Sequence, residues 1–192
     1  MTTIYFIRHA EPNRSPDGND ATFPLSEKGL ADRSLVTAFL KDKEIDVVLS
    51  SPFKRAVDTV ADFAAQAKLS VRTIDDFRER KIFTEWIDDF NSYVAKQWAD
   101  FSYKLDGGES LSEVQARNIA ALRAVLKQYK DKNIVIGTHG TALSTIIQHF
   151  DHRYGLDDFK SLAMPHAVKM VFDGESCVEI DKIDLFKINL AP

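Results

Sequence analysis

A short apolar run near the start of the chain, ending in two basic residues, constrains the fold most strongly. Residues 4–7 are four apolar or aromatic residues in succession, and Arg8 and His9 follow directly. Such a run is too short for a helix and is rich in β-formers, so it predicts a strand buried on both faces. Ligands of open α/β sheets bind at the carboxyl ends of strands. The basic pair is therefore a candidate ligand site, although an ordinary solvated strand end would look the same.

The next part of the chain alternates between helix and strand. Ser26 is the expected N-cap of a helix of about fifteen residues, and residues 45–49 are expected to form a second buried strand. Ser51 is predicted to cap the following helix, with Pro52 as its first residue and Arg55 in its first turn. This order predicts a parallel sheet and puts Arg55 near its carboxyl edge.

An aromatic-rich segment interrupts the alternation after a third strand, which we expect near residues 71–74. Residues 83–103 carry large apolar side chains at helical spacing, and no strand is indicated before residue 107. The pattern predicts a helical insertion, about residues 80–107, that forms a lid over a site, although each aromatic could equally be a core contact. The candidates for substrate contact are Phe83, Trp86 and Trp98 of the lid. Arg14, Arg80 and Lys81 are expected near the mouth of the site.

The second half repeats the opening arrangement of strand, imidazole and helix. Ser110 and Glu113 match a capping box for a helix through about residue 129. Residues 134–136 are the next buried strand, and His139 and Gly140 follow before an apolar helix. His139 should therefore reach the same sheet edge as the basic pair at the start of the chain.

The end of the chain predicts a hairpin and completes the expected fold. Residues 168–172 and 178–186 are apolar segments joined by a short connection that contains Asp-Gly, so at least one strand should be antiparallel. With 192 residues and 44% hydrophobic content, the chain can bury roughly 70% of its unfolded surface. We expect one α/β domain spanning residues 1–192, with a mostly parallel sheet.

Charge and cysteine content exclude several classes of protein. The net charge of −4 argues against a broad nucleic-acid surface, so local cations would have to hold any phosphate. The single cysteine, Cys177, cannot form an internal disulfide, which favours a reducing compartment. The sequence has no signal-peptide pattern and no apolar run long enough to span a membrane. The sequence thus predicts a cytoplasmic protein without membrane contact.

Five motifs occur in order along the chain. They are Arg8-His9-Ala10-Glu11, Leu25-Ser26-Glu27-Lys28-Gly29, Ser50-Ser51-Pro52 with Arg55, Ala56 and Thr59, Gly108-Glu109-Ser110, and Thr138-His139-Gly140. Together they resemble the histidine phosphatase superfamily, also called phosphoglycerate mutase-like. The resemblance implies a three-layer αβα sandwich, and phosphoryl transfer through a phosphohistidine with no metal or other cofactor.

The residue types agree with that chemistry. A transferring phosphoryl group spreads negative charge over three oxygens, which the planar forks of Arg8 and Arg55 match. We expect His9 to be the nucleophile, with its second ring nitrogen donating a proton to a fixed acceptor such as a backbone carbonyl. The cations should lower the pKa of the imidazoles. His139 should hydrogen-bond a phosphate oxygen, with amides near Gly140 as further donors.

The leaving oxygen needs a proton donor. The resemblance places this acid just after the third strand, which indicates Glu79 as general acid and then as general base for water. Asp75, Asp76 and Glu85 are the alternatives.

After its Arg-His pair the chain departs from the usual family sequence: Asn13 lies closer to the pair than the asparagine of the family does. Asn13 is a candidate phosphate ligand, and His166 is a candidate for substrate contact. His149 and His152 have a spacing that could suit a metal, but no third ligand is evident nearby, so surface residues are the simpler interpretation. The basic residues that hold a bisphosphate in mutases are not matched, which favours a phosphatase over a mutase.

The predicted function is a metal-independent phosphatase, of the histidine acid phosphatase type, that hydrolyses a phosphate monoester. Its partner would be a small phosphorylated substrate, whose identity the sequence leaves open together with the oligomeric state. The alternatives are mutase-type phosphoryl transfer, a non-catalytic phospholigand-binding protein, and a metallohydrolase. The last would need a cluster of carboxylates and histidines around His9 and Glu11, and would lose activity in EDTA.

Overall fold

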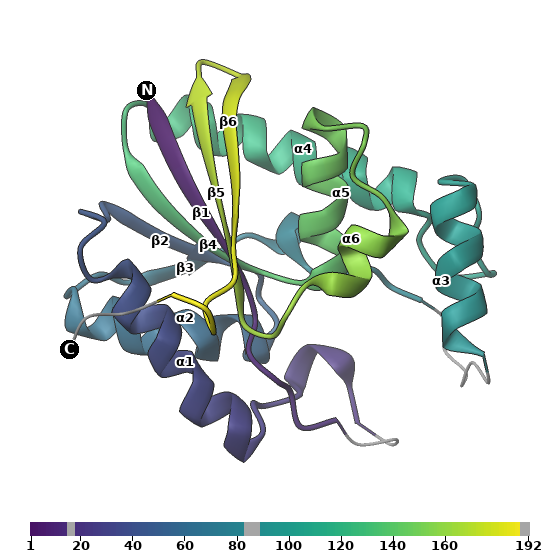
Figure 1. The fold of residues 1–192 in the computed structure, drawn as a ribbon, viewed down its shortest axis with the longest axis horizontal. Coiled ribbons are helices and arrows are strands. Elements are labelled where there is room, and N and C mark those ends of the chain that lie inside the picture. Colours follow the sequence, from purple (N-terminus) through teal and green to yellow (C-terminus); the bar gives the residue numbers. More distant parts are fainter. Residues whose placement is uncertain (15–17, 83–88, 189–192) are drawn as a thin grey trace.

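A single six-stranded sheet forms the centre of the molecule (Figure 1). This computed structural model describes residues 1–14, 18–82 and 89–188. The strand order is β3-β2-β4-β1-β5-β6; the first four strands pair in parallel, and β5 pairs antiparallel with both β1 and β6. The strands are β1 (Thr2–Arg8), β2 (Val47–Ser50), β3 (Val71–Thr73), β4 (Asn133–Thr138), β5 (His166–Asp173) and β6 (Ser176–Ile183). The predicted mostly parallel sheet with an antiparallel strand is confirmed.

Helices cover both faces of this sheet, which gives the expected three layers. In Figure 1, α1 and α2 lie on one face and α4 and α5 on the other, while α3 lies beyond the edge of the layers. The helices are α1 (Glu27–Leu40), α2 (Lys54–Gln66), α3 (Phe90–Ala99), α4 (Leu111–Gln128), α5 (Gly140–Phe150) and α6 (Leu156–Ser161), with short 3₁₀ helices η1 (Asp20–Thr22) and η2 (Asp75–Phe77). The sequence reasoning did not predict α6.

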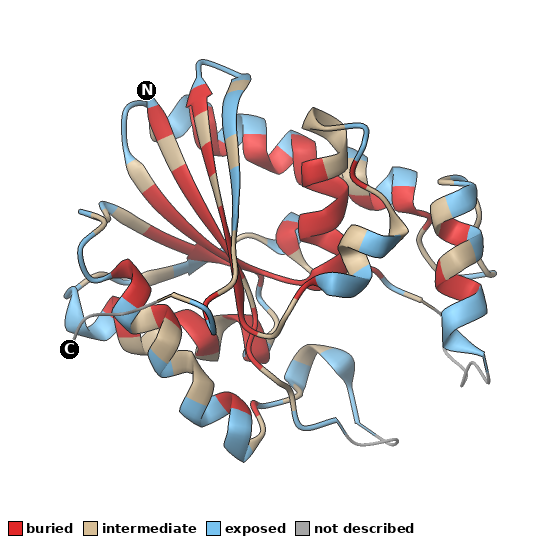
Figure 2. Cartoon of the chain, viewed as in Figure 1, coloured by how far each residue is buried: buried red, intermediate tan, exposed pale blue. Residues whose placement is uncertain are grey.

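The first strand is buried on both faces, as its uniform apolar run predicts. Ile4 and Phe6 belong to the core that packs under α4 and α5, whereas Tyr5 and Ile7 belong to the core under α1 and α2. Successive side chains of a strand point to opposite faces. The run therefore contributes to both cores at once, and Figure 2 shows the central strands as the buried centre of the fold.

The register between neighbouring strands brings the two histidine motifs together. Arg8 at the end of β1 pairs with Thr138 at the end of β4, and the backbone N–H of His9 donates to the Thr138 carbonyl at 3.0 Å. His9 and His139 each follow directly on these paired residues. Parallel pairing thus places the two imidazoles side by side at one edge of the sheet.

The helix starts agree with the sequence in two cases and differ in one. Ser26 caps α1, and Ser110 and Glu113 form the predicted capping box of α4. The predicted start of α2 is wrong, because its N-cap is Phe53 rather than Ser51. The Ser51 hydroxyl accepts the amide of Phe53 in a local turn and contacts a histidine ring, so the helix starts two residues later.

The hairpin at the end of the sheet is confirmed. A two-residue turn joins β5 to β6, and Gly174 adopts a positive φ of 59° there, a conformation that glycine accepts without steric cost. Among the described residues, no helix has the length and apolar character needed to cross a membrane.

Candidate active site

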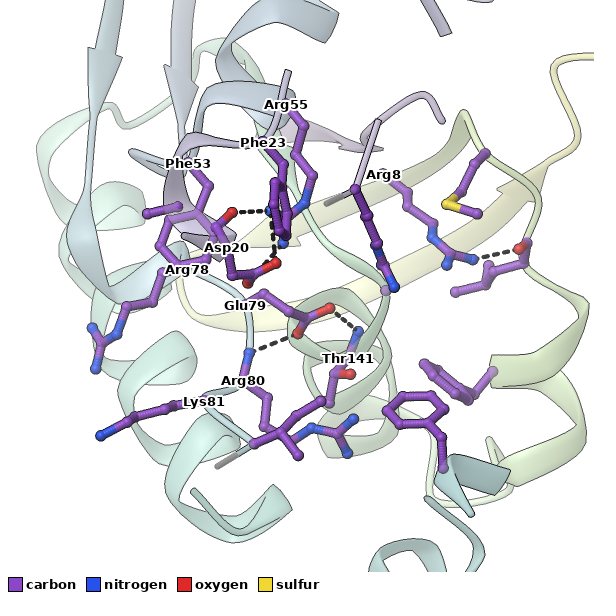
Figure 3. A pocket seen from close by; sticks show the side chains of 18 of the residues that line it. Arg8, Asp20, Phe23, Phe53, Arg55, Arg78, Glu79, Arg80, Lys81 and Thr141 are labelled. Atoms are coloured by element: carbon purple, nitrogen blue, oxygen red, sulfur yellow. Dashed lines mark hydrogen bonds and ion pairs between the residues drawn. The ribbon is translucent and has the colours of Figure 1, made fainter. Parts of the chain in front are cut away.

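A cavity of about 780 Å³ opens at the carboxyl ends of the parallel strands (Figure 3). Its lining contains five arginines and two lysines but, among the described residues, only two acids, Asp20 and Glu79. The chain as a whole is acidic, with a net charge of −4. Positive charge is therefore concentrated where the sequence reasoning required local cations, and the cavity is suited to an anion.

His9 lies beneath this lining, with both ring nitrogens engaged. Its Nδ1 is 2.7 Å from the carbonyl oxygen of Ala10, and its Nε2 is 3.2 Å from Nε of Arg55. A carbonyl can only accept and a guanidinium can only donate, so Nδ1 carries the proton and Nε2 presents a lone pair. The expected fixed acceptor is thus the Ala10 carbonyl, and this tautomer leaves the unprotonated Nε2 on the Arg55 side.

The environment of His9 keeps its ring neutral. The side chain is 2% exposed, and burial lowers its pKa well below 6.5, with His139, Arg55 and Arg8 adding to the effect. Burial is the largest cause, ahead of the neighbouring cations that the sequence indicated. The neutral form of the His9 ring, with Nε2 unprotonated, is therefore the form present at neutral pH.

Arg55 is held by its helix and by the loop opposite. It lies in the first turn of α2 and is 1% exposed. Thr59, one turn later, accepts the amide of Ala10 and donates to the Arg55 carbonyl, which links this helix to the loop after His9. The outer nitrogens of Arg55 contact the Asp20 carboxylate at 3.1 and 3.2 Å. The guanidinium thus bridges His9 and the cavity wall.

Arg8 supplies the second guanidinium. It lines the cavity and donates to the carbonyl of Leu162, while its Nε has no partner among the described residues. A Cβ added at Gly140 would lie 3.1 to 3.3 Å from three atoms of this guanidinium. Glycine at the start of α5 therefore allows the Arg8 fork to lie close against the backbone.

His139 completes the group of buried side chains. Its ring is fully buried and meets the His9 ring edge to face, with centroids 5.2 Å apart. Its Nε2 lies 2.7 Å from the hydroxyl oxygen of Ser51, and its Nδ1 has no partner in the described chain. Burial lowers the pKa of His139 well below 6.5, as do Arg55 and other nearby arginines. His139 is thus a neutral neighbour of His9.

Glu79 lies at the N-terminus of α5. One carboxylate oxygen accepts the amide of Thr141 at 3.0 Å, and the other accepts the amides of Ala142 and Arg80 at 3.2 and 2.8 Å. Burial raises the pKa of this carboxyl, but the Arg80 charge, these amides and Arg55 together lower it below its ordinary value. Without a ligand, Glu79 is ionised at neutral pH.

A second ion pair holds the segment around Glu79. The two carboxylate oxygens of Glu109 accept from Arg117 at 2.8 and 3.0 Å, and one of them accepts the amide of Lys81 at 2.9 Å. Arg117 also donates to the carbonyl of Glu79 at 3.2 Å. The Gly-Glu-Ser motif thus fixes the backbone that carries Glu79, a role that the sequence pattern did not reveal.

The alternative acids are placed differently. Asp75 and Asp76 are exposed, pair with Arg78, and do not line the cavity. Glu85 falls outside the described residues. Glu79 is thus the only one of these candidates that the described chain places against the cavity.

Two further candidates lie away from the cavity lining. Asn13 is exposed, its backbone N–H donates to the Pro24 carbonyl, and its side chain is not part of the lining, so this geometry gives no support to a phosphate contact. His166 opens β5 opposite Arg8 in the register, is 7% exposed, and has no hydrogen-bond partner among the described residues. Both roles stay predictions.

The candidate lid contributes in part to the cavity. Phe90 of α3 lines it, together with Arg14, Arg80 and Lys81 from the predicted mouth. Trp98 instead packs against the rings of Tyr154 and Phe159, at 6.1 and 5.8 Å between centroids, so it is a core contact. Phe83 and Trp86 lie outside the described residues.

The histidines considered for a metal are a half-buried His149 and an exposed His152. The described chain contains no group of three or more histidine, cysteine or acidic side chains that could hold a metal ion.

Comparison with known proteins identifies the family. The family model described as histidine phosphatase superfamily (branch 1) matches residues 4–177, and the chain belongs to this superfamily. Phosphoserine phosphatase 1 of Hydrogenobacter thermophilus is 27% identical over 155 residues, which are 72% of this chain and 71% of that protein. The metal-independent phosphoserine phosphatase of Arabidopsis thaliana is 28% identical over 160 residues, which are 76% of this chain and 67% of that protein.

Solved structures agree on the fold. Phosphoserine phosphatase from Entamoeba histolytica, in complex with 3-phosphoglyceric acid, superposes with a TM-score of 0.79 at 22% identity. The match covers 96% of this chain and 98% of that one. The resemblance to this superfamily and the αβα fold that it implied are confirmed.

Proposed function

We propose that this protein is a metal-independent phosphomonoesterase that works through a phosphohistidine on His9. The orientation of the His9 ring carries this proposal. Its protonated Nδ1 is fixed on the Ala10 carbonyl, so the lone pair of Nε2 is directed at a guanidinium that can hold the phosphoryl group. Membership of the superfamily and the names of the relatives support the same class of reaction.

The reaction would run in two displacements. Substrate phosphate first takes over the Nε–H of Arg55, which frees Nε2 of His9 to attack phosphorus. The bond from phosphorus to the leaving oxygen breaks, its electron pair stays on that oxygen, and Glu79 supplies the proton. Water then attacks the phosphohistidine, Glu79 takes a proton from it, and inorganic phosphate leaves. Arg8 and His139 would stabilise the charge on the phosphoryl oxygens.

Because Glu79 is ionised before substrate binds, the proton that it gives to the leaving oxygen has to come from the substrate. An unliganded Glu79 with a lowered pKa holds no proton near neutral pH. Phosphate binding adds negative charge nearby, which raises the pKa of a carboxyl. A phosphate monoester has its second pKa near 6, so its monoanion can bring the proton that Glu79 then passes to the leaving oxygen.

The substrate proposed is a small phosphorylated metabolite of the phosphoserine type. Two curated relatives are named phosphoserine phosphatases, and the Entamoeba histolytica enzyme has been solved with phosphoserine. The cavity of about 780 Å³ lies in the usual size range of small-molecule sites. Residues 1–192 would act as one domain, with residues 80–107 as a lid over this cavity.

The test is hydrolysis of an aryl phosphate in the presence of EDTA. We expect full activity with EDTA, loss of activity in His9→Ala, and unchanged activity in His152→Ala, which removes an exposed imidazole away from the cavity. Activity that requires an added metal, or that survives in His9→Ala, would contradict the proposal.

A further inference from the structure

Resting on the phosphatase function proposed above, we propose that Asp20 is a specificity-determining residue. Its carboxylate favours phosphomonoesters that carry an ammonium group close to the phosphate, such as phosphates of amino alcohols. Asp20 belongs to none of the five sequence motifs and was not a predicted site residue.

The Asp20 carboxylate occupies the two terminal nitrogens of Arg55, next to the Nε that the substrate phosphate would take over. One carboxylate oxygen is 3.1 Å from one terminal nitrogen of Arg55, and the other oxygen is 3.2 Å from the second terminal nitrogen. This is the paired geometry in which arginine binds carboxylate and phosphate alike. Figure 3 shows the Asp20 carboxylate directed at Arg55, with Arg8 and Glu79 at the same cavity.

Substrate therefore meets Asp20 when it binds. The third nitrogen of Arg55, Nε, donates to the nucleophilic Nε2 of His9, so a phosphoryl group in line with His9 lies against this guanidinium. A phosphate on Nε and the terminal nitrogen beside it competes with Asp20 for that terminal nitrogen and is repelled by the Asp20 charge. The Asp20 side chain is 52% exposed and sits on a short 3₁₀ helix, so it can shift aside while remaining next to the phosphate.

An ammonium group beside the phosphate resolves this conflict. A displaced carboxylate is left without its cation, and a substrate ammonium can take the place of Arg55 as its partner. The other acid of the described lining, Glu79, already accepts three backbone amides and faces Arg80. Asp20 is thus the acid in this lining that is available to a substrate cation.

The matched substrates are O-phospho-L-serine and 3-phospho-L-glycerate, which share the configuration at C2 and differ only by an ammonium in place of a hydroxyl. Phosphoethanolamine and ethylene glycol monophosphate form a second pair without the carboxylate. We expect wild type to prefer the ammonium member of each pair by about tenfold in kcat/KM, the scale of one charged contact. In Asp20→Asn the two members of each pair should differ by no more than about twofold.

Inorganic phosphate gives a second measurement that does not depend on turnover of these substrates. Removing the competing carboxylate should lower the inhibition constant of phosphate against aryl phosphate hydrolysis several-fold in Asp20→Asn. Thr22→Val is the matched control, because it removes a hydrogen bond to the Asn19 carbonyl from the same 3₁₀ turn without changing its charge. It should leave both the preference and the phosphate inhibition unchanged.

The remaining outcomes separate this inference from the function on which it rests. If Asp20→Asn lowers kcat/KM equally for both members of each pair and also binds phosphate more weakly, Asp20 only positions Arg55. That result would overturn the inference. The inference is also overturned if the protein hydrolyses aryl phosphate through His9 but hydrolyses none of the four matched substrates. If aryl phosphate hydrolysis does not depend on His9, the proposed function fails and the inference with it.

Discussion

The two walls of the cavity are built in different ways. The inner wall, as we use the term, is Arg55 of the cavity lining together with the buried His9 and His139 behind it. These three residues follow strands β2, β1 and β4 within a few residues and are almost completely buried. The outer wall comes from loops and short elements, including η1 with its half-exposed Asp20 and the start of α3. Strand register fixes the inner wall, whereas the outer wall can vary without disturbing the sheet. In the function proposed above, the core would thus place the catalytic residues and the surface would set selectivity.

This comparison makes a general prediction. Changes in the inner wall should lower activity toward every phosphomonoester, because all of them present the same phosphoryl group. Changes in the outer wall should alter the ranking of substrates and act mainly on KM.

The largest expected effect is at Arg55. Arg55→Ala should lower kcat/KM about 10³-fold on any substrate, because it removes a fixed donor to the phosphoryl oxygens. Arg55→Lys should recover little of this, since lysine lacks the planar fork. The control is Lys54→Ala, which removes the neighbouring exposed cation paired with Asp58. Losses of tenfold or less in both Arg55 variants, measured on protein with an unchanged circular dichroism spectrum, would refute the inner-wall account.

Glu79 should show an effect that depends on the leaving group. Glu79→Gln should lower kcat/KM, which reports phosphorylation of His9, about 10² to 10³-fold for an alkyl phosphate, since its leaving oxygen needs the proton. For an activated aryl phosphate kcat/KM should fall less than about tenfold. Steady-state kinetics on the two substrates measure the difference. Asp75→Asn, an exposed carboxyl near the same segment, serves as the control and should change neither rate. Equal losses on both substrates would remove Glu79 from the role of proton donor.

Gly140→Ala should have an intermediate effect. The added Cβ would lie 3.1 to 3.3 Å from the Arg8 guanidinium and push it from its place, so kcat/KM should fall about tenfold on all substrates. At Gly155 the nearest atom to an added Cβ is a carbonyl oxygen at 4.0 Å. Gly155→Ala is therefore the control, because it adds a methyl group without a steric clash. Comparing the thermal stabilities of the two variants separates an effect on the site from an effect on folding.

Lys160 tests the outer wall. It lines the cavity, is exposed and has no acidic partner among the described residues, so its charge is available to an anionic part of the substrate. Lys160→Ala should raise KM by about twofold to fivefold for substrates with a carboxylate, with kcat unchanged. A substrate without a carboxylate should be unaffected. A uniform fall in kcat would place Lys160 with the inner wall instead.

The smallest expected change is the change of kcat/KM with pH that titration of His9 would cause near neutrality. Protonation removes the lone pair of Nε2, so activity through His9 is lost only below the pKa of His9. Burial and nearby cations put that pKa well below 6.5. The kcat/KM for aryl phosphate should therefore not fall between pH 7 and 6. A decline with an apparent pKa near 6.5 in this range would show that the nucleophile is an ordinary, solvated histidine.

Sequence patterns predicted the inner wall because the same rules govern strands and their ends. A uniformly apolar run followed by Arg8 and His9 defines a buried strand and its edge, and Gly137 to Gly140 repeat that arrangement. The pairing of Arg8 with Thr138 then makes the contact between the two imidazoles a consequence of register. Capping patterns likewise located the starts of α1 and α4.

The outer wall could not be predicted in the same way. Asp20 lies in a loop with mixed polar composition, and its contact with Arg55 joins residues 35 positions apart with no periodic signal. One contact of the inner wall was also missed: Ser51 matched an N-cap pattern, but its hydroxyl contacts His139, a residue 88 positions away. Such contacts depend on how separate loops converge, which local patterns do not encode.

The most direct test of a nucleophilic His9 is rapid quench of Glu79→Gln with an activated aryl phosphate. This variant should still phosphorylate His9, because the leaving group needs little help, but should hydrolyse the adduct slowly without its base. We predict a burst of phenol equal to the enzyme concentration and a phosphoryl group on the peptide that contains His9. The adduct should be stable in base and labile in acid, as a phosphoramidate is. Phenol release without a burst, with no phosphoryl group retained on the protein, would contradict the phosphohistidine and favour direct attack by water.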